Sequence, residues 1–409
     1  MAKRDFLRRL GPGIVTGAAD DDPSGIGTYT SAGATAGYGF LWSALWLLPL
    51  AFAVQEATAG LALVTGKGLA AIIKSKMPRW VLIIAVLMVA IANTVNIAAN
   101  LSIMSAALGL LVPIEQWAGV VLFAVVLGVT EIYIPYHRYA KILRWLCLSL
   151  LAYVAVLFVA QVDWQQVVIS TFIPSLDFSR VSLGLLIALA GTTISPYLFF
   201  WQAAEEVEEN HGVKMRRVIL SNLQAMRGDV FAGMFTGVAI MFAVMATSAA
   251  TLNSQGIAEV SSAADAALAL EPIAGEFASL LFLLGIVGVG LLSIPVLAAS
   301  TAYAVAETFG WRESLELKPN QAKAFYTVIT ISIGVALLLN LIGIEPVHFL
   351  ILAATLNGLA APVLMAIIWW LARDKNLLGK WASGRISQIL VGFATLAMGS
   401  LPILWLLAG

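Results

Sequence analysis

DDDPSG, residues 20–25, interrupts an apolar stretch that otherwise runs from residue 12 to residue 38. Three carboxylates inside a membrane span cost roughly 2.5–3.5 kcal/mol each. Proline removes a backbone donor and glycine loosens the chain, so we expect the helix to unwind here. Residues 26–38 alone are too short to cross a bilayer, which favours a position within the span. The alternative is a helix end in the headgroup region.

A second interruption lies at residues 191–197, which read GTTISPY. It repeats the pattern of small or hydroxyl-bearing residues and a proline in the middle of an apolar run. Taken alone, Pro196 is also compatible with an ordinary kink in a membrane helix. Two breaks that are five spans apart are typical of an inverted repeat of five plus five helices, with the substrate site near the middle of the membrane.

The composition of the whole chain is that of a polytopic membrane protein. Of its 409 residues, 60% are hydrophobic and 11% are charged, and the mean hydropathy is +0.93. Soluble domains are about half apolar and a quarter charged. These values exclude a soluble enzyme, a disordered chain and a nucleic-acid-binding protein. A single cysteine, Cys147, excludes a disulfide framework.

Apolar windows of about nineteen residues predict eleven transmembrane helices in an all-α fold. They lie near residues 12–38, 40–65, 80–111, 116–134, 141–161, 182–204, 228–251, 275–306, 323–342, 346–372 and 386–407. We expect one transmembrane domain. Its first inverted repeat is 1–165, its second is 166–375, and an additional helix follows at 376–409.

The placement of charge predicts the orientation of these helices. With a cytoplasmic N-terminus, every Lys and Arg except Arg180 falls in a cytoplasmic segment, as the positive-inside rule requires. The outer loops carry acids instead, namely Glu115, Asp163, Asp177, Glu259, Asp265, Glu271 and Glu345. We therefore expect a multi-pass protein of a bacterial-type inner membrane, surrounded by lipid. Its oligomeric state stays open, and a monomer is the simplest expectation.

The residues at the two breaks predict a cation site. The candidate oxygen donors are the carboxylates of Asp22, Asp20 and Asp21, the freed carbonyls of Ala19 and Thr192, and the hydroxyl of Ser195. Hard oxygen donors suit Mg²⁺, Ca²⁺ and Mn²⁺ rather than Cu(I) or Zn²⁺. The small residues Ser24 and Gly25 leave room for a partly hydrated Mg²⁺, which gives up its waters reluctantly. The ion is expected as a transported substrate, and no cofactor is predicted.

These motifs resemble the NRAMP family of divalent-metal transporters over nearly the whole chain. The likeness is specific at residues 11–13 (GPG), 22–25 (DPSG) and 195–197 (SPY). It implies the LeuT-type fold and metal binding by Asp22. Gly25 stands at the family's metal-binding asparagine, and Thr192 stands at the alanine whose carbonyl binds metal.

Two departures from the family bear on selectivity. Ser195 stands where the family has a methionine whose sulfur helps it select transition metals, and Tyr197 stands where it has a histidine. The Asp triplet together with TTISPY, residues 192–197, resembles the NRAMP-related magnesium transporters, which carry Mg²⁺ and Mn²⁺. The resemblance therefore implies Mg²⁺ as the main substrate, with Mn²⁺ also carried.

Proton coupling is not expected. Transition-metal members of the family use the histidine and acids on the third span, and here that span offers Asn93, Asn96 and Asn100 on one helical face. Amides do not titrate. We predict uncoupled transport, with these asparagines and Tyr197 along the path; the alternative is that the asparagines only join helices. Asn357, on the tenth span, is a further candidate for the cavity.

Three other functions are alternatives to this interpretation. A proton-coupled Mn²⁺/Fe²⁺ symporter would keep the family's usual mechanism. A LeuT-fold transporter of an organic solute such as an amino acid would need backbone amides instead of Asp22. An intramembrane aspartyl protease needs two carboxylates on facing helices, and we identify no second acid deep in another span. We therefore expect that the protein is not an enzyme.

Overall fold

The computed structural model describes residues 16–17, 19–134, 150–209 and 220–408, and every regular element in these segments is a helix. The α-helices are α3 (Pro23–Ala36), α4 (Leu41–Thr65), α5 (Leu69–Lys76), α6 (Arg79–Gly109), α7 (Gln116–Tyr133), α9 (Leu151–Val156), α10 (Trp164–Phe172), α11 (Arg180–Thr193), α12 (Pro196–Glu209), α13 (Leu220–Thr251), α14 (Ala263–Leu268), α15 (Glu271–Ala274), α16 (Ala278–Phe309), α17 (Lys323–Leu339), α18 (Pro346–Ala372), α19 (Lys375–Leu378) and α20 (Arg385–Leu407). An all-helical fold was predicted, and it is confirmed for this part of the chain.

Within the described residues, nine helical stretches are long and apolar enough to cross a membrane. The first, Pro23–Thr65, covers two predicted spans, because the 3-10 turn η1 (Gly37–Phe40) joins α3 directly to α4. The first part of the predicted span at 141–161, residues 141–149, and the whole motif at 11–13 fall outside the described residues. The count of eleven and the cytoplasmic N-terminus therefore stay predictions.

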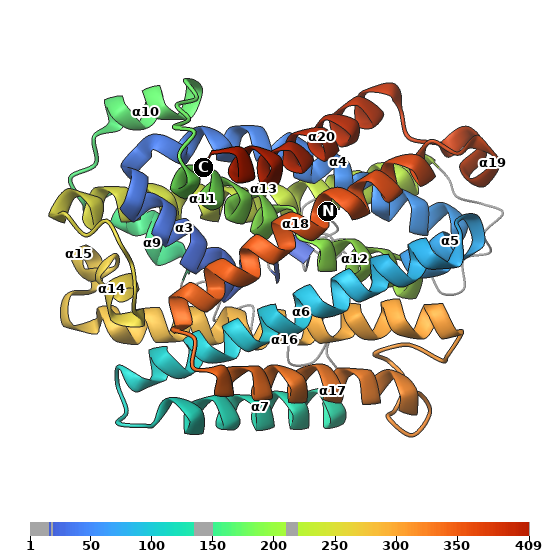
Figure 1. The fold of residues 1–409 in the computed structure, drawn as a ribbon, viewed down its shortest axis with the longest axis horizontal. Coiled ribbons are helices and arrows are strands. Elements are labelled where there is room, and N and C mark those ends of the chain that lie inside the picture. The colour runs from blue at the N-terminus through green and yellow to red at the C-terminus, as the bar shows by residue number, and fades with distance from the viewer. Residues whose placement is uncertain (1–15, 18, 135–149, 210–219, 409) are drawn as a thin grey trace, which may run out of the picture.

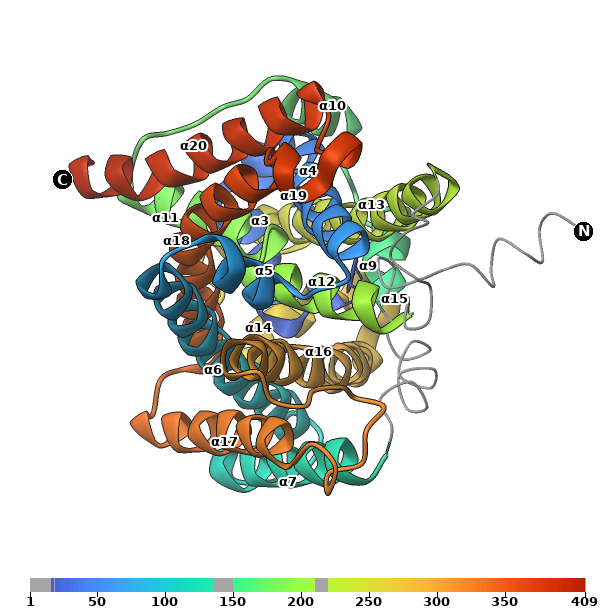
Figure 2. The same ribbon diagram turned by 90° about the vertical axis from the view of Figure 1, so that its right-hand side faces the viewer.

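The helices form layers around a central group (Figures 1 and 2). Helices α7 and α17 lie side by side at one edge, α6 and α16 form the next layer, and α20 lies toward the opposite edge. Helix α6 packs on α16, α7 on α17, and α4 on α13. Each of these contacts joins helices at equivalent positions of the two predicted repeats. The repeat boundaries themselves stay a prediction.

Glycine contacts bring the two interrupted helices into the centre. A Cβ on Gly17 would lie 2.3 Å from the carbonyl oxygen of Gly233 in α13. A Cβ on Gly191 would lie 2.2 Å from the backbone nitrogen of Gly358 in α18. Real Cβ atoms do not approach so closely, so both contacts require glycine, as in the small-residue packing of membrane helices. The backbone before the first break is thereby held against α13, and the backbone before the second break against α18.

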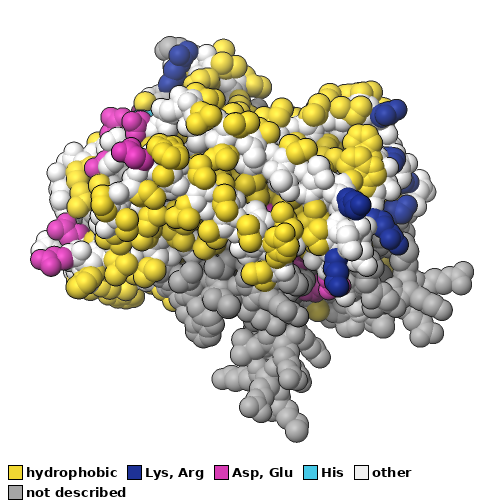
Figure 3. All heavy atoms as spheres, turned by 90° about the horizontal axis from the view of Figure 1, so that it is seen from below, with side chains coloured by type: hydrophobic (Ala, Val, Ile, Leu, Met, Phe, Trp, Pro, Cys, Tyr) yellow, Lys and Arg dark blue, Asp and Glu magenta, His cyan; other side chains and the backbone are white. Residues whose placement is uncertain are grey.

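The surface separates apolar and charged side chains. Figure 3 shows apolar side chains over most of one face, with Lys and Arg concentrated toward the end where α5 and α19 lie, and acids at the opposite end. The acidic end includes the exposed Asp163, Glu271 and Glu345. Basic side chains gathered at one end of an apolar face are the distribution that the positive-inside rule describes.

Candidate functional site

The first helix breaks at the Asp triplet. Thr16, Gly17, Ala19 and Asp20 are helical, the helix is interrupted after Asp20, and α3 begins at Pro23. Asp22 caps α3, because its Oδ1 accepts a 2.8 Å hydrogen bond from the backbone N–H of Gly25. An aspartate at the N-cap followed by proline at the first helical position is a strong local signal for a new helix start. The triplet is thus internal to the helical path.

The second break lies between α11 and α12. Helix α11 ends at Thr193, and α12 begins at Pro196. The hydroxyl of Ser195 donates to the carbonyl of Thr192 at 2.8 Å and to that of Gly191 at 3.1 Å. The predicted breaks in the first and sixth spans are therefore both present.

Each proline frees one carbonyl by the same rule. In a continuous helix the N–H of residue i bonds to the carbonyl of residue i−4. Pro23 has no N–H for Ala19, and Pro196 has none for Thr192. The Tyr197 hydroxyl donates to the Ala19 carbonyl at 2.8 Å, and the Ser195 hydroxyl donates to the Thr192 carbonyl at 2.8 Å. Both freed carbonyls are therefore satisfied by hydroxyls that flank Pro196.

The two breaks lie side by side. A Cβ on Gly25 would stand 3.2 Å from Thr192 Oγ1, and Ser195 lies close enough to Asp20 to interact with its carboxylate. Asp22 and Ser195 are each 1% exposed. The structure thus brings the carboxylates of the first helix and the carbonyls and hydroxyls of the sixth into one buried region.

The three aspartates divide between two neighbouring helices. Asp22 Oδ2 accepts a 3.0 Å hydrogen bond from the Asn100 amide on α6. Asp20 Oδ2 and Asp21 Oδ1 lie 3.6 and 3.7 Å from the position a Cβ on Gly237 of α13 would take. The predicted donors Asp20 and Asp21 are therefore near the break but on its α13 side, whereas Asp22 faces α6.

The carboxylates at the break are not clustered as in a dedicated metal centre. Among the described residues, no group of three or more His, Cys, Asp or Glu side chains is arranged to hold a metal ion. On the α6 side, an ion between the breaks would meet the Asp22 carboxylate together with the neutral oxygens of the second break. Such a donor set leaves coordination positions for water.

The asparagines of α6 divide into two groups. Asn93 donates to the Leu297 carbonyl and to the hydroxyls of Ser300 and Thr301 on α16, so it joins two helices, as the alternative interpretation held. Asn100 contacts Asp22 directly. Asn96 is a near neighbour of Asp22, is 1% exposed, and has neither side-chain polar atom hydrogen-bonded.

Asn357 is also buried without partners. It is 0% exposed, and neither polar atom of its amide is hydrogen-bonded. It lies on α18, which packs against α3, α6 and α11. Gly358, the next residue, touches α11 at Gly191, close to the second break. Asn357 therefore lies on a helix that borders the site.

Several residues near the breaks were not identified from the sequence. Tyr29 lies beside Gly25, one helical turn further along α3. Gln202 of α12 is 0% exposed, and its Oε1 accepts a 2.6 Å hydrogen bond from the Thr16 hydroxyl. The available signal was a glutamine within the otherwise apolar PYLFFWQ, residues 196–202.

The sequence indicated no second acid deep in another span, and acids buried near the end of a span were not considered. Glu131 of α7 is 7% exposed, and neither carboxylate oxygen has a hydrogen-bond partner. It was overlooked because it lies near the end of a predicted span. Helix α7 packs on α6, α16 and α17, so Glu131 belongs to the outer layer and not to the breaks.

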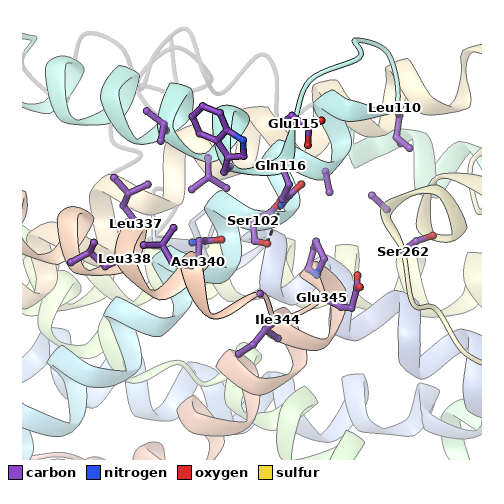
Figure 4. Close-up of a pocket in the computed structure, with 18 of the residues that line it drawn as sticks. Ser102, Leu110, Glu115, Gln116, Ser262, Leu337, Leu338, Asn340, Ile344 and Glu345 are labelled. Atoms are coloured by element: carbon purple, nitrogen blue, oxygen red, sulfur yellow. Dashed lines mark hydrogen bonds between the residues drawn. The ribbon is translucent and has the colours of Figure 1, made fainter.

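A cavity of about 830 Å³ approaches α6 from the acidic end of the molecule (Figure 4). Its wall includes Glu115, Gln116 and Glu345, and Gln116 donates to the Ser102 carbonyl at 2.8 Å. Ser102 also lines the cavity and lies two residues beyond Asn100 on α6. This cavity is thus separate from the breaks but lies along the helix that contacts Asp22.

Comparison with known proteins gives one family over almost the full length. Residues 13–408 match the family described as natural resistance-associated macrophage protein-like. A divalent metal cation transporter MntH from Acidiphilium cryptum is 26% identical, with 98% of this chain and 91% of the relative aligned. A second MntH, from Pectobacterium carotovorum subsp. carotovorum, is 25% identical over 94% of this chain and 91% of the relative.

Solved structures show the same fold. The manganese transporter of Eremococcus coleocola, in complex with an aromatic bis-isothiourea compound, gives a TM-score of 0.78 at 18% identity, covering 98% of this chain and 86% of that one. Mhp1, a nucleobase-cation-symport-1 family transporter, gives 0.60 at 14% identity, covering 98% and 90%. These likenesses show a LeuT-like fold for this chain.

Proposed function

Because the chain belongs to the natural resistance-associated macrophage protein-like family, we propose that it transports divalent metal cations across a membrane. The observation that carries this proposal is the meeting of two proline breaks around one carboxylate. Pro23 and Pro196 free the carbonyls of Ala19 and Thr192, and Asp22 lies buried at the same place. Bacterial relatives named as MntH transporters support a bacterial-type inner membrane as the location.

We propose Mg²⁺ as the main substrate, held with part of its water shell. The carboxylate of Asp22 and the hydroxyl of Ser195 in the second break, both hard oxygen donors, support this choice. Mg²⁺ is usually bound through one or two carboxylates and keeps several waters. The unpartnered amide of Asn96 next to Asp22 is suited to hydrogen-bonding such a water.

Mn²⁺ is the second candidate. Similar proteins are named as MntH and as a manganese transporter. Mn²⁺ also accepts oxygen ligands. Ser195 is the residue that bears on the choice, because a hydroxyl offers no soft donor to a transition metal. We therefore expect Mn²⁺ to compete with Mg²⁺ at this site.

We further propose that transport is uncoupled from protons. The groups on α6 that face Asp22 are the amides of Asn96 and Asn100, which do not titrate. The membrane potential supplies enough driving force, since two charges across 100 mV correspond to about 4.6 kcal/mol, on the order of a thousandfold accumulation.

The test is ion uptake into proteoliposomes with a pH dye inside. Wild type is expected to take up Mg²⁺ and Mn²⁺ with no change of interior pH beyond that of empty liposomes. Asp22→Asn removes the charge while keeping the size, and is expected to reduce uptake of both ions at least about tenfold, the effect of losing one charged ligand.

The matched control is Asp163→Asn, because Asp163 is an exposed N-cap residue of α10, outside the breaks. It should leave uptake unchanged. Uptake that persists in Asp22→Asn would refute the site, and interior acidification that follows Mg²⁺ would refute the uncoupled mechanism.

A further inference from the structure

A second cavity, of about 170 Å³, lies on the side of the molecule where α4, α13 and the segment before α20 meet. Arg227, Lys380, Ser383 and Gly384 line it, together with Glu56. Arg227 lies in the first two turns of α13, and Gly384 precedes the first residue of α20. The basic loops of the sequence predict that these helix ends are cytoplasmic, so the cavity lies near the inner headgroup level.

The acid in this cavity is already neutralised. Glu56 is buried, and its Oε1 accepts a 2.7 Å hydrogen bond from Arg227 Nε. Its Oε2 accepts a 2.9 Å bond from the Ser387 hydroxyl. The Nε contact uses one edge of the guanidinium, and the Arg227 side chain is 48% exposed. Its terminal nitrogens are thus available to an anion.

Lys380 adds a second cation to the same wall. Its Nζ lies 4.7 Å from the ring centroid of Trp381, and it has no ion pair with an acid in the described part of the chain. Ser383 contributes a hydroxyl, and no side chain caps α20 at Gly384. The cavity therefore carries net positive charge and hydrogen-bond donors that suit a phosphate group.

An exposed aromatic strip continues from this cavity toward the membrane interior. Phe231 and Phe235 follow Arg227 along α13 at one-turn steps, and they are 49% and 53% exposed. Phe52 of α4, one turn from Glu56, packs edge-on against Phe231 with ring centroids 5.7 Å apart. Helices α4 and α13 pack against each other, so the strip lies along their junction.

We propose that this cavity binds the phosphate of an anionic phospholipid, whose acyl chain lies along Phe52, Phe231 and Phe235. Anionic lipids are attracted to basic pockets between helices on the cytoplasmic side. The apolar strip favours a lipid over a free phosphate, because a soluble anion gains nothing from it. The lipid would join α4, α13 and α20 at a junction that the Glu56–Arg227 ion pair also crosses.

The test compares lipid binding to the purified full chain by native mass spectrometry, with phosphatidylglycerol and phosphatidylcholine added in equal amounts. Wild type is expected to retain phosphatidylglycerol in preference. Lys380→Gln is expected to weaken that binding about fivefold, the worth of one surface cation near an anionic headgroup. Lys375→Gln is the control, since Lys375 is exposed nearby on α19 but does not line the cavity.

Two further measurements make the result decisive. Phe231→Ala should weaken phosphatidylglycerol binding while leaving the cations in place, and soluble glycerol phosphate should compete poorly. Equal binding of both lipids, or an unchanged affinity in Lys380→Gln, would overturn the proposal. Full competition by glycerol phosphate would also overturn it, because the cavity would then be a site for free phosphate esters.

Discussion

The hydroxyl oxygen of Tyr197 lies 2.8 Å from the carbonyl oxygen of Ala19, so a side chain of α12 closes the gap that Pro23 opens in the first helix. The hydrogen bond joins the two interrupted helices where an ion is proposed to bind. The same carbonyl is a candidate ligand, so the hydroxyl and the ion compete for one oxygen.

Tyr197→Phe should lower the thermal stability of the ion-free protein. The Ala19 carbonyl would lose its partner in a buried place, at a cost of about 1–3 kcal/mol. Saturating Mg²⁺ should reduce the difference in thermal stability between Tyr197→Phe and wild type, because the ion becomes a new partner for the Ala19 carbonyl. Thermal unfolding in detergent with and without Mg²⁺ measures both effects. Identical melting of the two ion-free proteins would show that the hydrogen bond does not stabilise the fold, and a difference that Mg²⁺ leaves unchanged would contradict the competition.

Gly25→Ala should reduce ion uptake without preventing folding. The new Cβ would stand 3.2 Å from Thr192 Oγ1 and 3.3 Å from the ring of Tyr29, so the two breaks must separate slightly. Overpacking of this kind costs typically about 1–3 kcal/mol. Adding Thr192→Ala removes one of the close atoms and should restore part of the uptake. Gly128→Ala, where no atom lies within 4 Å, is the control.

Gly17→Ala should cause a large loss of folded protein. Its Cβ would lie 2.3 Å from the Gly233 carbonyl oxygen, and backbone atoms are unable to yield as a flexible side chain does. The control is Gly228→Ala on α13, the helix that carries Gly233, where the new Cβ would meet no atom within 4 Å. That control should gain up to about 1 kcal/mol from helix propensity. The monodisperse yield from size-exclusion chromatography distinguishes the two; equal yields would refute the close contact.

Glu313 should make the protein more stable in mildly acidic than in alkaline solution. Burial and the nearby charges of Glu307 and Glu208 raise the pKa of this loop carboxyl to about 8. Because the folded pKa lies above the unfolded value, the stabilisation is full below the unfolded pKa and is lost as pH rises through about 8. The melting temperature of Glu313→Gln should therefore change less between pH 5 and pH 9 than that of wild type. An unchanged pH profile would show that Glu313 does not titrate there.

The sequence predicted the two breaks because their causes are local. A proline four residues after a carbonyl removes that carbonyl's helical partner, and this rule holds at Ala19 and at Thr192 regardless of the rest of the fold. The all-helical membrane architecture was predictable for a similar reason, since it follows from long apolar runs.

The directions of the side chains at the breaks were not predictable. Asp22 faces α6 and Asp20 faces α13, although only one residue lies between them, because irregular backbone separates them. Asn93 shares a face with Asn100, yet it is two turns away and meets α16 instead. Which neighbour a side chain meets depends on the packing of distant helices, which periodicity does not encode.

The hydrogen bond between Asn100 and Asp22 gives the carboxylate two duties. The carboxylate joins α3 to α6, and it is also a proposed ligand of the ion. An ion that binds Asp22 must therefore share the carboxylate with Asn100 or weaken their hydrogen bond. Ion binding would then weaken the contact between α3 and α6. The two helices would stay joined in the ion-free protein and could move relative to each other once the ion is bound.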